Sequence, residues 1–167
     1  MNTQEYIIND IAPFNIDTNI LEVQDIFNQL TYSHVPVKND KIYIGCISEN
    51  DAHCFEGTKQ LKDYLYALET FFVREKTNWL DILEAFALHN SNIMPVLGKD
   101  NTYIGYYELS DIMSLFNNTP FLNKAGGIIV IEKEQRDYSF SEICQIVESN
   151  NAKILGVFIS KINGDIV

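Results

Sequence analysis

The sequence predicts an α/β fold (α+β) in which one small unit occurs twice and a shorter β-α-β tail follows. Residues 17–51 align with residues 76–111 at a shift of 59, which becomes 60 after one inserted residue. Ten of about 35 aligned positions are identical and in the same order. Such a repeat indicates one supersecondary unit used twice, with each copy helping to bury the other. The identical residues are Thr18, Asn19, Leu21, Phe27, Pro36, Val37, Tyr43, Ile44, Gly45 and Asp51 with their partners Thr77, Asn78, Leu80, Phe86, Pro95, Val96, Tyr103, Ile104, Gly105 and Asp111.

The two copies also share one order of local patterns. Apolar residues at spacings of three and four predict a helix in 20–30 and another in 79–89. Short apolar runs then predict paired strands, joined by turn-forming residues at 39–41 and 98–101. A returning helix closes each copy. The predicted strands are 35–37, 43–47, 94–97 and 103–107, and the returning helices are 48–53 and 109–116.

Polar residues mark where the first helix of each copy begins. Asn19 and Glu22 have the spacing of a capping box, with Asn in place of Ser or Thr, and Asn78 and Asp81 repeat it. We therefore expect both asparagines to cap their helices.

Two further segments complete the predicted organisation. Residues 55–70 join the copies, and leucines at 61, 65 and 68 suggest a helical link. Turn formers at 117–120 mark a boundary. Beyond it, the pattern predicts a strand in 128–131, a helix in 140–147 capped by Ser139 or Ser141, and a strand in 154–159.

Composition excludes several classes of function. The net charge is −11 and there are only two arginines, so we expect no nucleic-acid binding and no binding to anionic membranes. No apolar run approaches the roughly 18 residues needed to span a bilayer. The N-terminus is acidic, which is not typical of a signal peptide. Three irregularly spaced cysteines fit a reducing, cytoplasmic setting.

The order of cap, helix, Pro-Val strand, Gly-containing strand and closing Asp resembles the CBS domain. Such domains usually occur as tandem pairs, and the resemblance implies a pair over residues 1–116 with pseudo-twofold symmetry. The repeats would span about 7–54 and 71–116. The resemblance also implies a homodimer formed through the helices. Residues 117–167 resemble a truncated first half of an ACT domain, an arrangement similar to the acetoin-utilisation regulatory protein family.

The resemblance also implies a ligand site in the first repeat. CBS pairs that bind adenosine compounds end the second strand in Gly-h-h-Thr/Ser-x-x-Asp, where h is an apolar residue. Residues 45–51 keep this pattern, with Ser48 facing phosphate and Asp51 accepting from ribose hydroxyls. Pro36 and Val37 would contact the adenine of AMP, ADP, ATP or S-adenosylmethionine. The alternative is that Ser48 and Asp51 only cap the following helix.

The second repeat departs from that pattern. Glu108 stands where Thr or Ser belongs, although Asp111 could still hold the ribose of an uncharged nucleoside. A carboxylate about 4 Å from a phosphate would repel it by roughly 4 kcal/mol at an effective dielectric constant near 20. We therefore expect phosphate binding to be lost at this repeat, unless Arg74 compensates.

No catalytic motif is present, so we expect a regulatory protein and not an enzyme. The rival hypothesis is a dimerisation or protein-interaction scaffold without a small ligand. Cys46, Asp51, His53 and Cys54 match no zinc spacing, so no metal site is expected. His34 aligns with Ile93, which favours a packing role.

Overall fold

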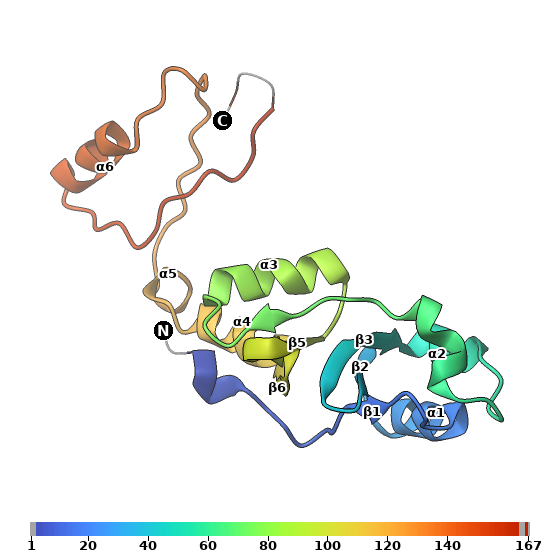
Figure 1. Cartoon of the computed structure of the whole chain (residues 1–167). Helices are drawn as coiled ribbons and strands as arrows, with labels where there is room; N and C mark the ends of the chain where they lie inside the picture. Colours follow the sequence, from blue (N-terminus) through green and yellow to red (C-terminus); the bar gives the residue numbers. More distant parts are fainter. Residues whose placement is uncertain (1–2, 164–165, 167) are drawn as a thin grey trace. The chain divides into compact units, whose positions relative to one another are not determined.

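The computed structural model describes residues 3–163 and residue 166. The chain divides into two compact units, residues 1–115 and residues 116–167 (Figure 1). The first unit contains both repeats. Three short 3-10 helices accompany its main elements: η1 (Thr3–Tyr6), η2 (Leu61–Ala67) and η3 (Lys99–Asn101).

The first repeat forms a three-stranded sheet in the order β1-β2-β3, with two helices. Strand β1 runs parallel to β2, and β2 pairs antiparallel with β3. Helices α1 and α2 contact each other, and Figure 1 shows them side by side. The elements are β1 (Phe14–Asn15), α1 (Ile20–Gln29), β2 (His34–Asn39), β3 (Ile42–Ser48) and α2 (Glu49–Cys54).

The second repeat has the same topology and register. Phe14 pairs with Val37 in the first sheet, and the equivalent residues Val73 and Val96 pair in the second. Both hairpins shift register at the same point, after Val37 and after Val96. The predicted mixed α/β fold of two equivalent copies is therefore confirmed. The elements are β4 (Val73–Arg74), α3 (Trp79–His89), β5 (Ile93–Leu97), β6 (Tyr103–Glu108) and α4 (Leu109–Asn117).

Each repeat has its own hydrophobic core, and two residues of the first repeat also enter the core of the second. Tyr43 and Cys46 belong to the first repeat but pack in the core of the second. Burial raises the pKa of the Cys46 thiol to about 12, so this cysteine stays protonated and unreactive. The first core contains Ile20, Val23, Phe27, Val35, Val37, Ile47, Ala52, Leu61 and Tyr64, and the second adds Phe71, Val73, Ile82, Phe86, Met94, Val96, Leu97, Tyr107, Ile112 and Leu115.

The segment that precedes each repeat pairs with the edge strand of the other repeat. Ile8 exchanges two backbone hydrogen bonds with Tyr106 on β6, at 2.8 and 2.9 Å. Glu69 exchanges two with Cys46 on β3, also at 2.8 and 2.9 Å. Cys46 and Tyr106 are equivalent residues of the two repeats, so these contacts are reciprocal.

Two further contacts join residues that are equivalent to each other. Ile42 bridges Thr102, which lies 60 positions later. Ser33 bonds Asn92, which lies 59 positions later: the Ser33 N–H donates to Asn92 Oδ1 at 2.8 Å, and the Asn92 N–H donates to Ser33 Oγ at 3.0 Å. Contacts between equivalent residues place a pseudo-twofold axis between the repeats.

The glycine shared by both repeats is required by this exchange. A Cβ at Gly105 would collide with the carbonyl oxygen of Ile8, and one at Gly45 would lie 3.0 Å from that of Glu69. Gly45 also has a positive φ of 150°. The Tyr-Ile-Gly identity therefore reflects the close approach of a second backbone.

The two predicted helix caps have different outcomes. The Asn78 side chain accepts hydrogen bonds from the N–H groups of Leu80 and Asp81, so this cap is confirmed. Asn19 makes no side-chain cap. In the amide orientation that pairs donors with acceptors, its nitrogen donates to the carbonyls of Gly57 and Lys59. The predicted first cap is therefore wrong, because the linker competes for this amide.

In the second unit, the predicted helix is present as α6 (Phe140–Ser149), and Ser139 accepts a hydrogen bond from the Glu142 N–H. A short helix, α5 (Pro120–Asn123), precedes it. The strands predicted in 128–131 and 154–159 are absent from those segments. A strand is stable only when its backbone groups pair with a neighbour, and neither segment has one among the described residues. The ACT-like assignment stays a prediction.

We predict that Gly105→Ala lowers the free energy of unfolding by about 1–3 kcal/mol, the range expected for forcing atoms into a packed region. Gly45→Ala should also destabilise, because it meets the equivalent contact. Denaturant unfolding of the purified chain measures both effects.

Gly57→Ala is the matched control, since a Cβ there finds ordinary contacts at 3.6 Å and beyond. If Gly105→Ala were no more destabilising than Gly57→Ala, the exchanged segment would not need the glycine.

Candidate functional site

Ser48 and Asp51 lie together where β3 meets α2. The Ser48 hydroxyl accepts a hydrogen bond from the Asp51 N–H at 3.1 Å and donates to Asp51 Oδ2 at 2.8 Å. These bonds are those of a helix cap, so the capping role foreseen for this pair is present. Both residues are half-buried, and no bond from another described residue reaches Asp51 Oδ1. That oxygen remains able to accept a ligand hydroxyl.

Pro36 and Val37 lie on the central strand β2 and are buried. Pro36 is opposite Cys46 and Val37 is opposite Gly45 on β3. Val37 belongs to the first core, and the residue opposite Ser48 on β2 is His34.

At the second repeat, Glu108 ends β6 and Asp111 lies in the first turn of α4. The Glu108 carboxylate accepts hydrogen bonds from the Tyr32 hydroxyl at 2.6 Å and from Ser110 Oγ at 3.2 Å. Tyr32 comes from the first repeat, just before β2, so this bond crosses between the copies. Among the described residues, no hydrogen bond is found for the Asp111 carboxylate.

Arg74 does not compensate the charge of Glu108. Its guanidinium donates to the Gly98 carbonyl and to Asn101 Oδ1, and lies over the Phe72 ring. Arg74 therefore fixes the hairpin turn of its own repeat. The alternative that it neutralises Glu108 is wrong.

A second carboxylate, that of Asp10, is linked to Tyr32 through Tyr106. The Tyr106 hydroxyl lies 3.0 Å from that of Tyr32 and donates to Asp10 Oδ1 at 2.6 Å. Burial raises the pKa of Tyr106, and the bond to Asp10 adds to the shift. Burial, followed by the bond to Glu108, raises the pKa of Tyr32. Both phenols are therefore protonated at neutral pH.

The Glu108 cleft has a volume of about 580 Å³. Both repeats contribute to it: residues 29–32 come from the first repeat, and Asn92 and residues 108–110 come from the second. Glu108 is the only charged group in its lining, which consists of Gln29, Leu30, Thr31, Tyr32, Asn92, Glu108, Leu109 and Ser110.

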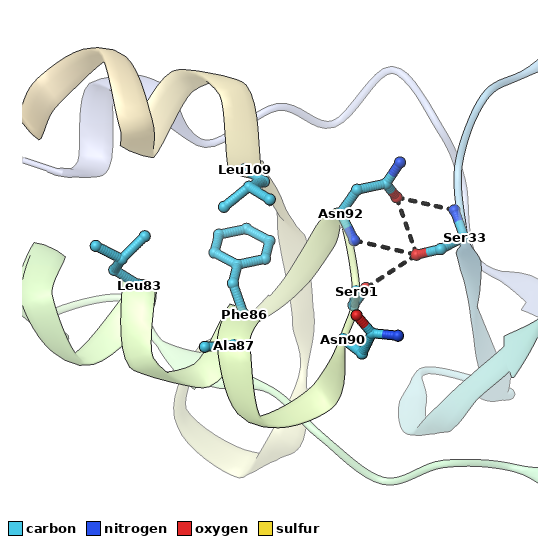
Figure 2. A pocket seen from close by; sticks show the side chains of 8 residues that line it. All are labelled: Ser33, Leu83, Phe86, Ala87, Asn90, Ser91, Asn92 and Leu109. Carbon is cyan, nitrogen blue, oxygen red and sulfur yellow. Dashed lines mark hydrogen bonds between the residues drawn. The ribbon is translucent and has the colours of Figure 1, made fainter. Parts of the chain in front are cut away.

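The α3 cleft, of about 410 Å³, lies beside the C-terminal end of α3. Figure 2 shows the apolar side chains of Leu83, Phe86 and Leu109 gathered on one side of it. Ser33, Ser91 and Asn92 lie on the other side, joined by hydrogen bonds to the Ser33 hydroxyl (Figure 2). Ala87 and Asn90 complete its lining.

The five residues predicted from sequence to bind ligand do not line either cleft. Ser48, Asp51, Pro36, Val37 and Asp111 lie outside both linings. Sequence reasoning missed Tyr32, Asn92 and Asp10, because their contacts with the second repeat join positions far apart in the chain and leave no local pattern. Glu108 was the single signal, since it interrupts the repeat.

His34 is buried, and its ring contacts Ser33 Oγ at 2.9 Å and Glu69 Oε1 at 3.3 Å. It also meets the Phe71 ring edge-on at 5.3 Å. Within the described residues, no group of three or more His, Cys, Asp and Glu side chains is placed to hold a metal ion. The described helices also include none with the length and hydropathy to cross a bilayer.

No protein-family model and no curated protein matches the chain. Solved structures do. A CBS domain pair/ACT domain protein from Thermotoga maritima is 18% identical, with a TM-score of 0.62, over 70% of this chain and 96% of that one. The CBS domains of a transcriptional regulator from Streptococcus pneumoniae are 16% identical, with a TM-score of 0.61, over 68% and 98%.

CBSX2 in complex with AMP is 14% identical, with a TM-score of 0.57, over 69% of this chain and 95% of that one. These structures share the two small sheets and flanking helices described above. The chain therefore has the fold of a tandem CBS domain pair.

Proposed function

We propose that residues 1–115 form a regulatory module that senses an adenosine-type compound at the first repeat. AMP, ADP, ATP and S-adenosylmethionine are the candidates. Structures with the same fold have been solved with AMP, with ATP and with c-di-AMP. The observation that carries the proposal is the contrast between the two copies. Ser48 presents a neutral hydroxyl at the position where Glu108 presents a carboxylate.

The proposed contacts follow from the chemistry at the first repeat. Asp51 Oδ1 accepts from a ribose hydroxyl, and Ser48 can turn its hydroxyl from Asp51 Oδ2 toward the ligand. Pro36 and Val37 supply the apolar wall for the base. A charge-assisted hydrogen bond of this kind contributes about 1.5–3 kcal/mol.

The regulatory step would be a population shift in the packing of the two repeats. The repeats meet through reciprocal backbone pairing at Ile8 and Glu69, so a ligand at one copy can favour one packing over another. The size of the shift is limited by the difference in ligand affinity between the two packings.

The second candidate function is a homodimeric interaction scaffold that needs no small ligand. Large apolar side chains are exposed on the helices: Leu80 and Leu88 on α3 are 55% and 73% exposed, and Met113 on α4 is 45% exposed. Leu21 on α1 is 57% exposed. Exposed apolar groups that share helix surfaces favour a protein interface.

Asp51→Ala should weaken AMP binding about 10–100-fold, because it removes the ribose acceptor. Asp111→Ala, the equivalent change in the second repeat, should leave the affinity within about twofold, as expected for a residue without contact to the ligand. Calorimetry on the two variants and the wild type makes the comparison. Equal losses of AMP affinity in the two variants would mean that both repeats bind AMP. An absence of heat with every adenosine compound would favour the scaffold hypothesis.

Glu108→Thr should raise the AMP stoichiometry from one to two per chain, because it removes a repulsion of roughly 4 kcal/mol. Glu22→Gln, an exposed change on α1, removes the same charge elsewhere and should leave the stoichiometry at one. A stoichiometry that stays at one in Glu108→Thr would show that charge is not what closes the second repeat.

Light scattering should give about twice the chain mass of 19.2 kDa at micromolar concentration. Leu88→Glu should yield a monomer, because it puts a charge on the helix face proposed to be buried. Tyr66→Glu, on η2 and 81% exposed, is the control and should remain a dimer. A wild-type monomer at tens of micromolar would contradict the dimer.

A further inference from the structure

Four side chains form a continuous line across the boundary between the repeats. Asp10, Tyr106, Tyr32 and Glu108 follow one another at oxygen–oxygen distances of 2.6, 3.0 and 2.6 Å. A carboxylate stands at each end of the line, and two phenols stand between them. The residues come from the segment before β1, from β6 and from the loop before β2.

These four side chains have too few protons for their three oxygen–oxygen contacts. Each phenol carries one proton, and both protons are donated outward, Tyr106 to Asp10 and Tyr32 to Glu108. The 3.0 Å contact between the two phenol oxygens then has no proton left to share. Neutral hydroxyls are thus the partners of both carboxylates.

No cation from the described part of the chain offsets these charges. The ion pairs found among the described residues join His34 to Glu69, Lys59 to Glu56 and Lys62 to Asp17. Arg74 is held at the turn of its own hairpin. The net charge of −11 adds a field that attracts cations to any concave surface.

The Glu108 cleft gives such a cation room to bind. Its volume of about 580 Å³ lies in the range of small-molecule sites. Apart from Glu108 its lining is uncharged, and Gln29, Thr31, Asn92 and Ser110 supply polar groups. Each carboxylate oxygen of Glu108 has one partner and can accept another hydrogen bond.

We propose that the Glu108 cleft binds a small organic cation, with a protonated amine or guanidinium placed against the Glu108 carboxylate. Tyr32 then shares or yields its bond to Glu108 and can donate to Tyr106 instead, which restores the missing proton in the Tyr32–Tyr106 contact. The second repeat thus takes a ligand of opposite charge to a nucleotide. The proposal for this site does not rest on ligand binding at the first repeat.

The test uses a pair of probes with one shape and different charge, butylguanidinium and butylurea. Titration of the isotope-labelled full chain is followed by the NMR shifts of the backbone amides of residues 29–32 and 108–110. Butylguanidinium should give saturable shifts there, and butylurea should bind at least about tenfold more weakly, because it cannot form the charge-assisted bond.

Three variants locate the site. Glu108→Gln should weaken butylguanidinium at least about tenfold, whereas the control Glu22→Gln should stay within about twofold, because charges more than a Debye length away are largely screened at physiological salt. Tyr32→Phe keeps the ring that packs edge-on against Tyr106 but removes the competing hydroxyl, so binding should be equal or tighter.

The proposal would be overturned if the butylguanidinium shifts did not saturate, or if butylurea bound as tightly as butylguanidinium. It would also be overturned if Glu108→Gln and Glu22→Gln bound butylguanidinium with the same affinity. Saturable shifts with MgCl₂ that depend on Glu108 in the same way would likewise contradict it. If Glu108→Gln does not fold, the probe pair and Tyr32→Phe still decide the outcome. AMP titrated into the wild-type chain, where Glu108 keeps the second repeat closed to phosphate, reports separately on the first repeat, so failure of one site is distinguishable from failure of the other.

Discussion

The two repeats hold together because each receives the backbone of the other's leading segment. Ile8 pairs with Tyr106 and Glu69 pairs with Cys46, so the edge strands β6 and β3 are covered by a neighbour. An uncovered edge strand would be free to pair with other chains. The exchange also brings Asp10 beside Tyr106, two residues beyond the pairing at Ile8. The geometry of the second-repeat site is thus a consequence of how the repeats interlock.

The predicted fold rested on local signals, and those signals were sufficient where structure is local. Apolar spacing located α1 and α3, and the Pro-Val runs located β2 and β5. The Gly45 and Gly105 identity was visible, but its cause was not, because the atoms that exclude a Cβ belong to a distant segment. Asn19 failed as a cap for a related reason, since the carbonyls it meets lie on the linker at Gly57 and Lys59.

In the second unit, a sequence pattern typical of a buried strand is present, but the strand is not. Residues 128–131 have the composition of a buried strand, yet Ile128, Ile129 and Val130 are 93%, 70% and 83% exposed. β-Propensity describes how well a residue fits a half-buried sheet surface, and it requires a sheet to fit into. Only α6, whose backbone bonds are internal to the helix, forms as predicted without a partner.

The two copies have kept one backbone while their polar residues have diverged. Ser48 and Glu108 occupy equivalent positions at the end of β3 and β6, but Ser48 bonds within its own turn while Glu108 reaches Tyr32 of the other repeat. Backbone exchange fixes both positions, so a single substitution changes the charge of one site without moving the other. If both proposed sites bind their ligands, this divergence would give one module two sites with opposite charge preference. Because both sites lie on elements that meet at the pseudo-twofold axis, ligands at the two sites would act on the same repeat–repeat packing.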